Sequence, residues 1–310
     1  DAEDALSKIK TSTREGRFFD KAPSTPWVDA AAQFLSWAEA NVKPATARMY
    51  QNSIRNLTPY LEAYPLDRIT PPMLEQFKVK RLSAGARPAT VNRDLATVKR
   101  LFSLAEPWGL VELDPIRKVQ LLRENNARVR YLTAAEENRL LEACRTPHLR
   151  LAVLIALNTG LRKDGVFTLR WSEVDFDLNR ISKAVKGDRK VYVPLTGTLR
   201  EALLEAKRGK ILSQYVLPSP KSPGEPCSDL KRGFSEALRG ARLKDFRWHD
   251  LRHVFATNFL RRTKDINALR EILGHADLKM TMRYAHILDE HLKEAMAKFS
   301  QGDSLYSEEA

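Results

Sequence analysis

Cysteine and long apolar runs are both scarce in this chain of 310 residues. Its two cysteines, Cys144 and Cys227, are too few for a disulfide framework or a four-cysteine zinc site. Such sparse use of cysteine is typical of a reducing compartment inside the cell. No apolar run approaches the ~20 residues of a membrane helix, and no charged-then-apolar signal segment opens the sequence. We therefore expect a cytoplasmic protein that has no contact with a membrane.

Nucleotide-binding and metal-binding motifs are also missing. There is no GxxxxGK[ST] segment, which excludes a P-loop and an ATP-driven motor. No cluster of carboxylates could hold paired magnesium ions. The segment HDLRH at 249–253 resembles the zinc motif HExxH, but Asp250 replaces the glutamate and Arg252 would lie beside the dication. No third ligand is apparent, so we expect neither a metal nor a cofactor.

Positive charge is what the chain has in excess. Lysine and arginine total 52 against 39 acidic residues, a net charge of +13 that is spread over both halves of the chain. Hydrophobic residues make up 43% and charged residues 29%, which is ordinary globular usage and excludes disorder over most of the length. A basic protein of this kind usually has a polyanionic partner, and double-stranded DNA is the leading candidate. The alternative is that the charge only serves solubility.

The hydrophobic periodicity predicts a mainly α fold in about two domains. The first domain is a helical unit over 26–113 whose helices begin near Trp27, Pro44, Thr70 and Pro88. Residues 1–25 look irregular, 114–130 read as a basic linker, 131–299 form a second domain and 300–310 form a mobile tail. In that second domain Thr133 and Glu136 predict a capping box that opens a helical stretch.

The second domain changes character once. Over 180–194 two short β-prone runs flank the turn residues KGD, a pattern that predicts a β-hairpin. Helical patterns follow, and Gly274 is placed to end one of them. The predicted helices cover 196–207, 228–240, 249–262, 265–273 and 286–299.

Four segments carry residues suited to phosphate chemistry: NTGLR, VKGDRKVYVPL, WHDLRHVFAT and LGHADLKMTMRYAH. They provide two arginines, a lysine at a hairpin turn, two histidines and a tyrosine, which are the types needed to attack a DNA phosphodiester with a phenol. In the second domain these side chains are Arg162, Lys186, His249, Arg252, His275 and Tyr284.

On these motifs the chain resembles the tyrosine site-specific recombinases, or phage integrase family, over roughly 26–299. The resemblance implies a helical core-binding domain that helps to clamp DNA and an α-rich catalytic domain with a small β-hairpin. It implies cleavage through a 3′-phosphotyrosyl intermediate and strand exchange, of the kind that integrates or excises a mobile element. It also implies a homotetramer on two DNA sites at the nucleoid, and it allows accessory DNA-bending proteins.

Each residue of the set has a role and a structural alternative. Tyr284 would be the nucleophile, although a free phenol with a pKa of about 10 is weak at neutral pH. Arg162 and Arg252 would hold the non-bridging phosphate oxygens. Lys186 would act as general acid on the 5′ oxygen. His249 would give acid–base help to Tyr284, and His275 would donate to the phosphate. The alternatives are a core tyrosine, surface cations and structural histidines, and we favour the structural interpretation for His253 and His286.

One position departs from the family pattern. The family usually has an acidic residue three after the first arginine, where this chain has Gly165. Glycine inside a helix costs about 1 kcal/mol relative to alanine, so replacing Gly165 with Glu is expected to raise cleavage or stability. Gly165 is also the one feature that favours a DNA-binding accessory protein with decayed catalysis. A topoisomerase-like nicking and closing enzyme is a further alternative.

Two expectations concern surfaces. The apolar stripe of 286–299 (Ile287, Leu288, Leu292, Met296 and Phe299) could pack on its own domain or dock on a neighbouring protomer. Contacts with DNA phosphates would position the duplex without reading its sequence. The candidate basic residues for them are Arg87, Arg93, Lys99, Arg100, Arg239, Arg242, Lys244 and Arg247.

Overall fold

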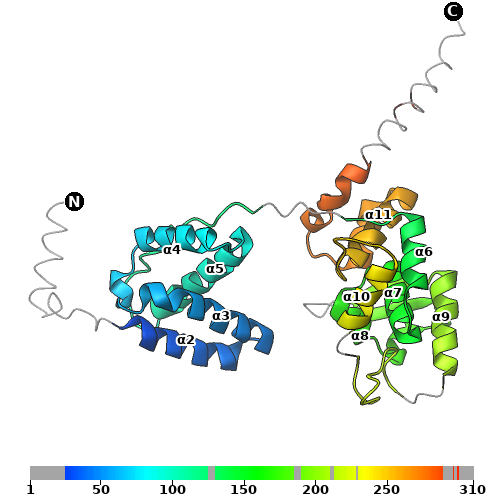
Figure 1. Cartoon of the computed structure of the whole chain (residues 1–310), viewed down its shortest axis with the longest axis horizontal. Helices are drawn as coiled ribbons and strands as arrows, with labels where there is room; N and C mark the ends of the chain where they lie inside the picture. The colour runs from blue at the N-terminus through cyan, green and yellow to red at the C-terminus, as the bar shows by residue number, and fades with distance from the viewer. Residues whose placement is uncertain are drawn as a thin grey trace, which may run out of the picture. The chain divides into compact units, whose positions relative to one another are not determined.

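The computed structural model divides the chain into two compact units, residues 1–126 and 127–310. The mainly α fold predicted from periodicity is confirmed, and one small antiparallel sheet lies in the second unit (Figure 1). Among the described residues, no helix is long and apolar enough to cross a membrane. The residues that the structure describes are 25–124, 130–184, 190–209, 213–227, 230–288, Met296 and Phe299.

The first unit is built from four helices that begin near the predicted positions Trp27, Pro44, Thr70 and Pro88. Proline occupies the first turn of three of them, where its fixed φ suits the helix and its missing N–H is not needed. Thr70 lies at the predicted cap, but its side chain makes no capping hydrogen bond, so Pro71 is what sets that start. The helices are α2 (Trp27–Asn41), α3 (Pro44–Leu61), α4 (Pro71–Ser83) and α5 (Pro88–Ala105), with a short 3-10 turn η1 (Leu66–Arg68) between α3 and α4.

Apolar faces of these four helices form one core. Figure 1 shows α2 and α3 side by side, with α4 and α5 next to them, and α5 contacts each of the other three. Trp27, Leu57, Phe77 and Phe102 are fully enclosed. Each such side chain contributes about 1.5–3 kcal/mol through burial, so this unit has a hydrophobic core of its own.

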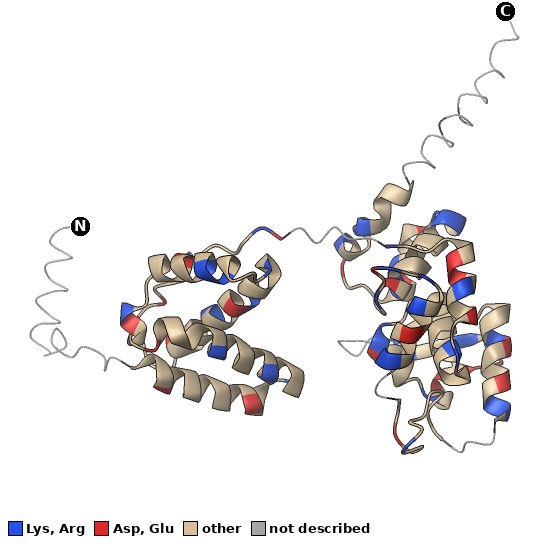
Figure 2. Ribbon diagram, viewed as in Figure 1, with Lys and Arg blue, Asp and Glu red and all other residues tan. Residues whose placement is uncertain are grey.

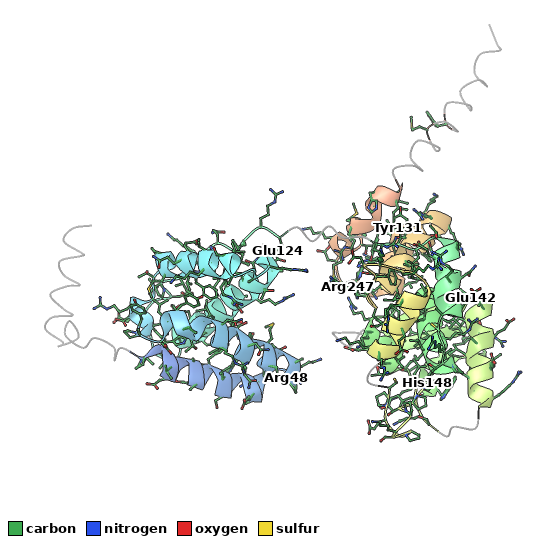
Figure 3. The ribbon with its side chains drawn as sticks, in the orientation of Figure 1. Arg48, Glu124, Tyr131, Glu142, His148 and Arg247 are labelled. Carbon is green, nitrogen blue, oxygen red and sulfur yellow. The ribbon has the colours of Figure 1, made fainter. Side chains whose placement is uncertain are left out.

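The segment predicted as a linker over 114–130 is in part a component of the first unit. Ile116 and Val119 are buried in its core. The side chain of Asn92 pairs with both backbone groups of Leu122, at 2.8 Å each, and also donates to Oε1 of Glu124 at 2.6 Å (Glu124 is labelled in Figure 3). Ile116, Val119 and Leu122 recur every three residues, but basic residues surround them in the sequence, and the stretch was therefore predicted to be a linker.

In the second unit α7 lies at the centre, with α6, α8, α9 and α11 packed against it (Figure 1). The predicted capping box is confirmed, because the Thr133 hydroxyl accepts from the Glu136 N–H and the Glu136 carboxylate accepts from the Thr133 N–H. The helices are α6 (Ala134–Glu142), α7 (Pro147–Thr159), α8 (Lys163–Phe167), α9 (Gly197–Arg208), α10 (Lys231–Gly240), α11 (Asp250–Thr263) and α12 (Ile266–Leu273), with 3-10 turns η2 (Trp171–Glu173), η3 (Leu278–Met280) and η4 (Met282–Leu288).

The predicted hairpin is confirmed as two strands of a three-stranded antiparallel sheet. Strand β2 (Arg180–Ala184) pairs with β3 (Lys190–Pro194), and Ile181 lies opposite Val193 with both side chains in the core. A two-residue strand, β1 (Val174–Asp175), pairs with the other edge of β2 and is too short to predict from sequence. Lys186 lies within 185–189, outside the described residues.

The structure differs from the helix predicted over 286–299 at the start of that range. The chain there is a 3-10 segment, η4, in which Ile287 and Leu288 pack against the core of their own unit. Met296 and Phe299 are exposed. The other positions after 288, like the segments 1–24 and 300–310, lie outside the described residues.

Candidate active site

Arg252 is the best-anchored side chain of the site. It lies in the first turn of α11 and is only 5% exposed. Its Nη1 donates to the carbonyl of Gly160 at 2.6 Å, and its Nη2 donates to the carbonyl of Leu273 at 2.7 Å. The guanidinium of Arg252 therefore joins the C-terminal ends of α7 and α12 to α11. Burial and the nearby positive charge of Arg162 lower the pKa of Arg252 to about 10.

Gly160, in the TGLR segment, sets the turn between α7 and α8. This glycine ends α7 in the left-handed conformation, with φ of 63°. A Cβ atom there would lie 2.4 Å from Cδ1 of Phe255, so a larger residue would force the Phe255 ring to move. The turn also directs the Gly160 carbonyl to Arg252 and places Arg162 at the start of α8.

His275 follows a second glycine, Gly274, which ends α12 with the same backbone geometry. The ring is 8% exposed and uses both nitrogens: Nε2 accepts from Nη2 of Arg252 at 2.8 Å, and Nδ1 lies 2.8 Å from Oγ1 of Thr281. Because a guanidinium can only donate, the proton of the neutral ring is on Nδ1. Burial, followed by the charges of Arg252 and Arg162, lowers the pKa of His275 to about 4. In this structure His275 thus positions Arg252, and the expected donation to a phosphate would require one of these bonds to break.

Tyr284 lies on η4 and is 1% exposed. Its ring packs in an apolar cluster with Phe255 and Leu269. The phenol oxygen lies 2.6 Å from Nδ1 of His253, a residue that is also buried. Burial raises the pKa of Tyr284, and the charges of Arg252 and Arg283 oppose that rise. The phenol is therefore protonated at neutral pH in the protein alone.

These side chains line one cavity of about 390 Å³. No carboxylate is among its described lining residues, whereas four of them are arginine or lysine. Concentrated positive charge without an acidic partner favours an anion. The lining residues are Arg162, His249, Arg252, His253, His275, Lys279, Met280, Arg283 and Tyr284.

Five of the six side chains predicted from sequence meet at this cavity; the sixth, Lys186, lies outside the described residues. His249 is exposed, and its ring packs edge-on against His253 with 5.1 Å between ring centroids. Burial, followed by the charge of Arg252, lowers its pKa. It is His253, four residues further along α11, that makes the hydrogen bond to the phenol of Tyr284. Among the described residues, no group of three potential metal ligands comes together.

Sequence reasoning did not name Lys279 or Arg283 among the polar residues of the cavity, and it interpreted a third, His253, as structural. A signal for His253 was available, because it lies four residues after His249 and so on the same helix face. Arg283 directly precedes Tyr284 in the chain. Lys279 carried no signal, since its position depends on η3 folding back over the site.

The surface cations predicted to contact DNA are mostly exposed, and Figure 2 shows lysine and arginine spread over both units. Two of them are engaged within the first unit. Lys99 donates to the carbonyl of Arg117 at 3.2 Å, and the Arg100 guanidinium lies over the Trp37 ring at 5.2 Å. All of the candidates except Lys99 are exposed, namely Arg87, Arg93, Arg100, Arg239, Arg242, Lys244 and Arg247, of which Arg247 is labelled in Figure 3.

Gly165 lies in α8, three residues after Arg162, which caps the start of that helix. A Cβ atom there would meet only Leu161, at 3.6 Å from its Cβ, which is ordinary van der Waals contact. The backbone at Gly165 therefore accepts a side chain.

Comparison with known families agrees with this geometry. Residues 130–291 match the phage integrase family, and residues 33–107 match the phage integrase N-terminal SAM-like domain. The chain belongs to the phage integrase family and is a tyrosine recombinase, an enzyme of site-specific DNA recombination.

Curated relatives come from phages and from bacteria. The integrase of Salmonella phage P22 is 30% identical over 223 residues, which cover 67% of this chain and 57% of that integrase. Tyrosine recombinase XerC of Oceanobacillus iheyensis is 25% identical over 291 residues, covering 88% of this chain and 95% of XerC. The integrase of Haemophilus phage HP1 is 28% identical over 286 residues, which cover 87% of this chain and 77% of that integrase. The chain thus spans just over half of the P22 integrase but nearly all of XerC.

Solved structures share the fold. A lambda integrase tetramer bound to a Holliday junction aligns with a TM-score of 0.71 and 21% identity, covering 84% of this chain and 78% of that one. The Tn1549 transposon integrase in complex with a circular intermediate DNA aligns with a TM-score of 0.71 and 19% identity. The alignment covers 89% of this chain and 100% of that one.

Proposed function

We propose that this protein cleaves and rejoins DNA through Tyr284 and that the exchange integrates or excises a mobile element. The observation that carries the proposal is the cavity in which the phenol of Tyr284 meets the guanidiniums of Arg162 and Arg252 without any described carboxylate. Support for the biological task comes from the phage integrases among the relatives, at 28% and 30% identity.

The proposed reaction is a transesterification. The Tyr284 oxygen attacks the scissile phosphorus, the bond from phosphorus to the 5′ oxygen breaks, and a 3′-phosphotyrosyl linkage forms. Arg162 and Arg252 neutralise the charge that builds on the non-bridging oxygens. Lys186 supplies the proton for the departing 5′ oxygen. A 5′-hydroxyl of the partner strand then reverses the step, so the bond energy is retained and no ATP is needed.

The proposed partner is double-stranded DNA, bound by a homotetramer on two sites. The structural neighbours include lambda integrase as a dimer on a core site and as a tetramer on a Holliday junction. In this chain, the exposed apolar side chains of Met296 and Phe299 are suited to a contact with a neighbouring protomer. A DNA substrate would place the protein in the cytoplasm at the nucleoid, where accessory DNA-bending proteins could assist.

The test is covalent trapping on a nicked duplex that carries the protein's own site, first recovered by selecting DNA that the protein binds. We expect an adduct that survives denaturation and that disappears in Tyr284→Phe. Tyr64→Phe is the matched control, because Tyr64 is an exposed tyrosine of the first unit.

Two other outcomes would contradict the proposal. Absence of an adduct on the selected site would indicate a DNA-binding accessory protein, in line with the missing acidic residue at Gly165. Relaxation of a supercoiled plasmid without that site would indicate a nicking and closing enzyme.

A further inference from the structure

The hydrogen bond between His253 and Tyr284 is the most direct polar contact of the nucleophile. The two atoms, Nδ1 and the phenol oxygen, lie 2.6 Å apart, at the short end for a neutral pair. His253 is 6% exposed and Tyr284 is 1% exposed. Both side chains are enclosed and line the same cavity. The contact is therefore a fixed part of the site.

We propose, on the basis of the function proposed above, that His253 is the catalytic base that takes the phenol proton of Tyr284. As the bond between the Tyr284 oxygen and phosphorus forms, the proton passes from that oxygen to Nδ1 of His253. The bond to the 5′ oxygen breaks at the same time, and the departing oxygen is protonated as in the reaction proposed above. During rejoining, the imidazolium of His253 returns the proton to the phenolate that leaves phosphorus.

Geometry favours His253 over His249 for this task. His249 is exposed at the rim and meets His253 edge-on, with an angle of 87° between the rings. His253 thus contacts the ring of His249 and the phenol oxygen of Tyr284. A base must be within hydrogen-bond reach of the proton that it removes, and His253 satisfies that condition.

The charges around His253 make its action depend on bound DNA. On α11 it faces His249, Asp250 and Arg252, and from η4 it faces Arg283 and Tyr284. Burial, followed by the positive groups among these, lowers the pKa of His253 to about 4. The ring is therefore neutral and able to accept a proton, but the imidazolium is unfavourable in the protein alone. A scissile phosphate brings negative charge into the cavity and offsets the arginines, so proton transfer becomes favourable when substrate is present.

His253→Asn separates positioning from proton transfer. The amide of asparagine can still hydrogen-bond the phenol, but it cannot act as a base at neutral pH. We expect normal folding and DNA affinity with single-turnover cleavage slower by about 10²-fold or more, the usual contribution of a general base. The substrate should carry sulfur in place of the 5′ bridging oxygen, because this leaving group needs no general acid and the rate then reports on the nucleophile alone.

The pH profile on this substrate is the decisive measurement. We expect the parent protein to cleave at a nearly constant rate from about pH 6 to 8, because His253 is already neutral there. The Asn variant should gain about tenfold per pH unit, because Tyr284 must then lose its proton to solvent. His286→Asn is the control, since His286 is exposed and its Nδ1 lies 3.1 Å from the carbonyl oxygen of Arg283; its rate and profile should match the parent.

Three results would overturn the proposal while leaving the function intact, because the parent would still form the Tyr284 adduct. One is an Asn variant with the parental rate and profile. Another is a faster Asn variant, which would make His253 a restraint on the phenol. The last is a profile that changes in His249→Asn instead. If His253→Asn unfolds, His253→Ala with added imidazole replaces it, and recovery of the rate with imidazole concentration is expected. Absence of any adduct from the parent would instead contradict the proposed function.

Discussion

At the scale of single residues, the guanidinium of Arg252 does more than present charge. It donates to two backbone carbonyls and to His275, and thus holds three segments in register around the cavity. A lysine could supply the charge but not the fork. Replacing Arg252 is therefore a test of geometry as much as of electrostatics.

We expect Arg252→Lys to lower adduct formation by at least about 10²-fold, the usual cost of removing one donor from a developing oxyanion. The carbonyls of Gly160 and Leu273 would also lose their partner, each at a cost of about 1–3 kcal/mol in unfolding free energy. Trapping assays and urea denaturation measure the two effects. Arg200→Lys, an exposed arginine on α9, is the control and should change neither. Parental trapping by Arg252→Lys would contradict the assigned geometry.

Gly160 leads to a second residue-scale prediction. Gly160→Ala should destabilise the catalytic unit by about 3 kcal/mol or more, since strain at positive φ adds to overpacking against Phe255. Urea denaturation of the full chain, followed by fluorescence, measures the loss. Gly197→Ala is the matched control, because a Cβ at Gly197 has nothing within 4 Å and its φ is ordinary. Equal stability of the two variants would show that the turn tolerates a side chain.

The two buried histidines predict how stability depends on pH. The pKa values of His253 and His275 are each lowered to about 4, from an ordinary value near 6.5. Between these values the unfolded chain binds more protons than the folded one, so acid favours unfolding. The contribution is complete above pH 6.5 and is lost as pH falls toward 4. Unfolding free energies measured across this window should decrease with acid, and less so in His275→Asn than in the parent. A pH-independent stability would contradict both assignments.

At the scale of elements, α8 is a helix of the second unit that a substitution at Gly165 is expected to stabilise. Gly165→Ala should raise the unfolding free energy by up to about 1 kcal/mol, because the new methyl group meets only Leu161 at ordinary distance. Gly165→Glu should add a favourable interaction with the helix N-terminus and raise cleavage or stability further. Denaturation and trapping rates measure both variants. Lower stability of Gly165→Ala would mean that the helix needs glycine for a reason other than space.

Much of the element layout could be predicted from sequence, because helix periodicity, first-turn prolines and the Thr133–Glu136 box are local signals. The elements that escaped prediction depend on distant partners. Strand β1 is defined by its pairing with the edge of β2. The segment η4 is held by Tyr284, whose side chain packs in the same core cluster as Phe255. His253 was interpreted as structural for a related reason, since Tyr284, the hydrogen-bond partner of its ring, lies 31 residues away.

At the scale of the whole molecule, the net charge of +13 predicts DNA binding that weakens steeply with salt. Arg93 is an exposed candidate phosphate contact on α5. We expect Arg93→Ala to weaken binding uniformly across sequences and to reduce the slope of log affinity against log salt by about one. Titrations at several salt concentrations measure the slope. Glu39→Ala is the control on the same unit, because loss of an exposed carboxylate should not reduce it. An unchanged slope would remove Arg93 from the DNA surface.

The anchoring of Leu122 and Glu124 by Asn92 leaves few residues between the two units, because the next buried side chain among the described residues is that of Leu132. At about 3.3–3.6 Å per residue, a chain segment this short spans less than about 30 Å even when fully extended. Once one unit is on the duplex, the other is confined to a small volume around it at millimolar local concentration. The pair would then behave as a bivalent ligand whose avidity exceeds that of either half by about 10²–10⁴. Cutting the chain after Glu124 would abolish that gain without removing a single contact to DNA.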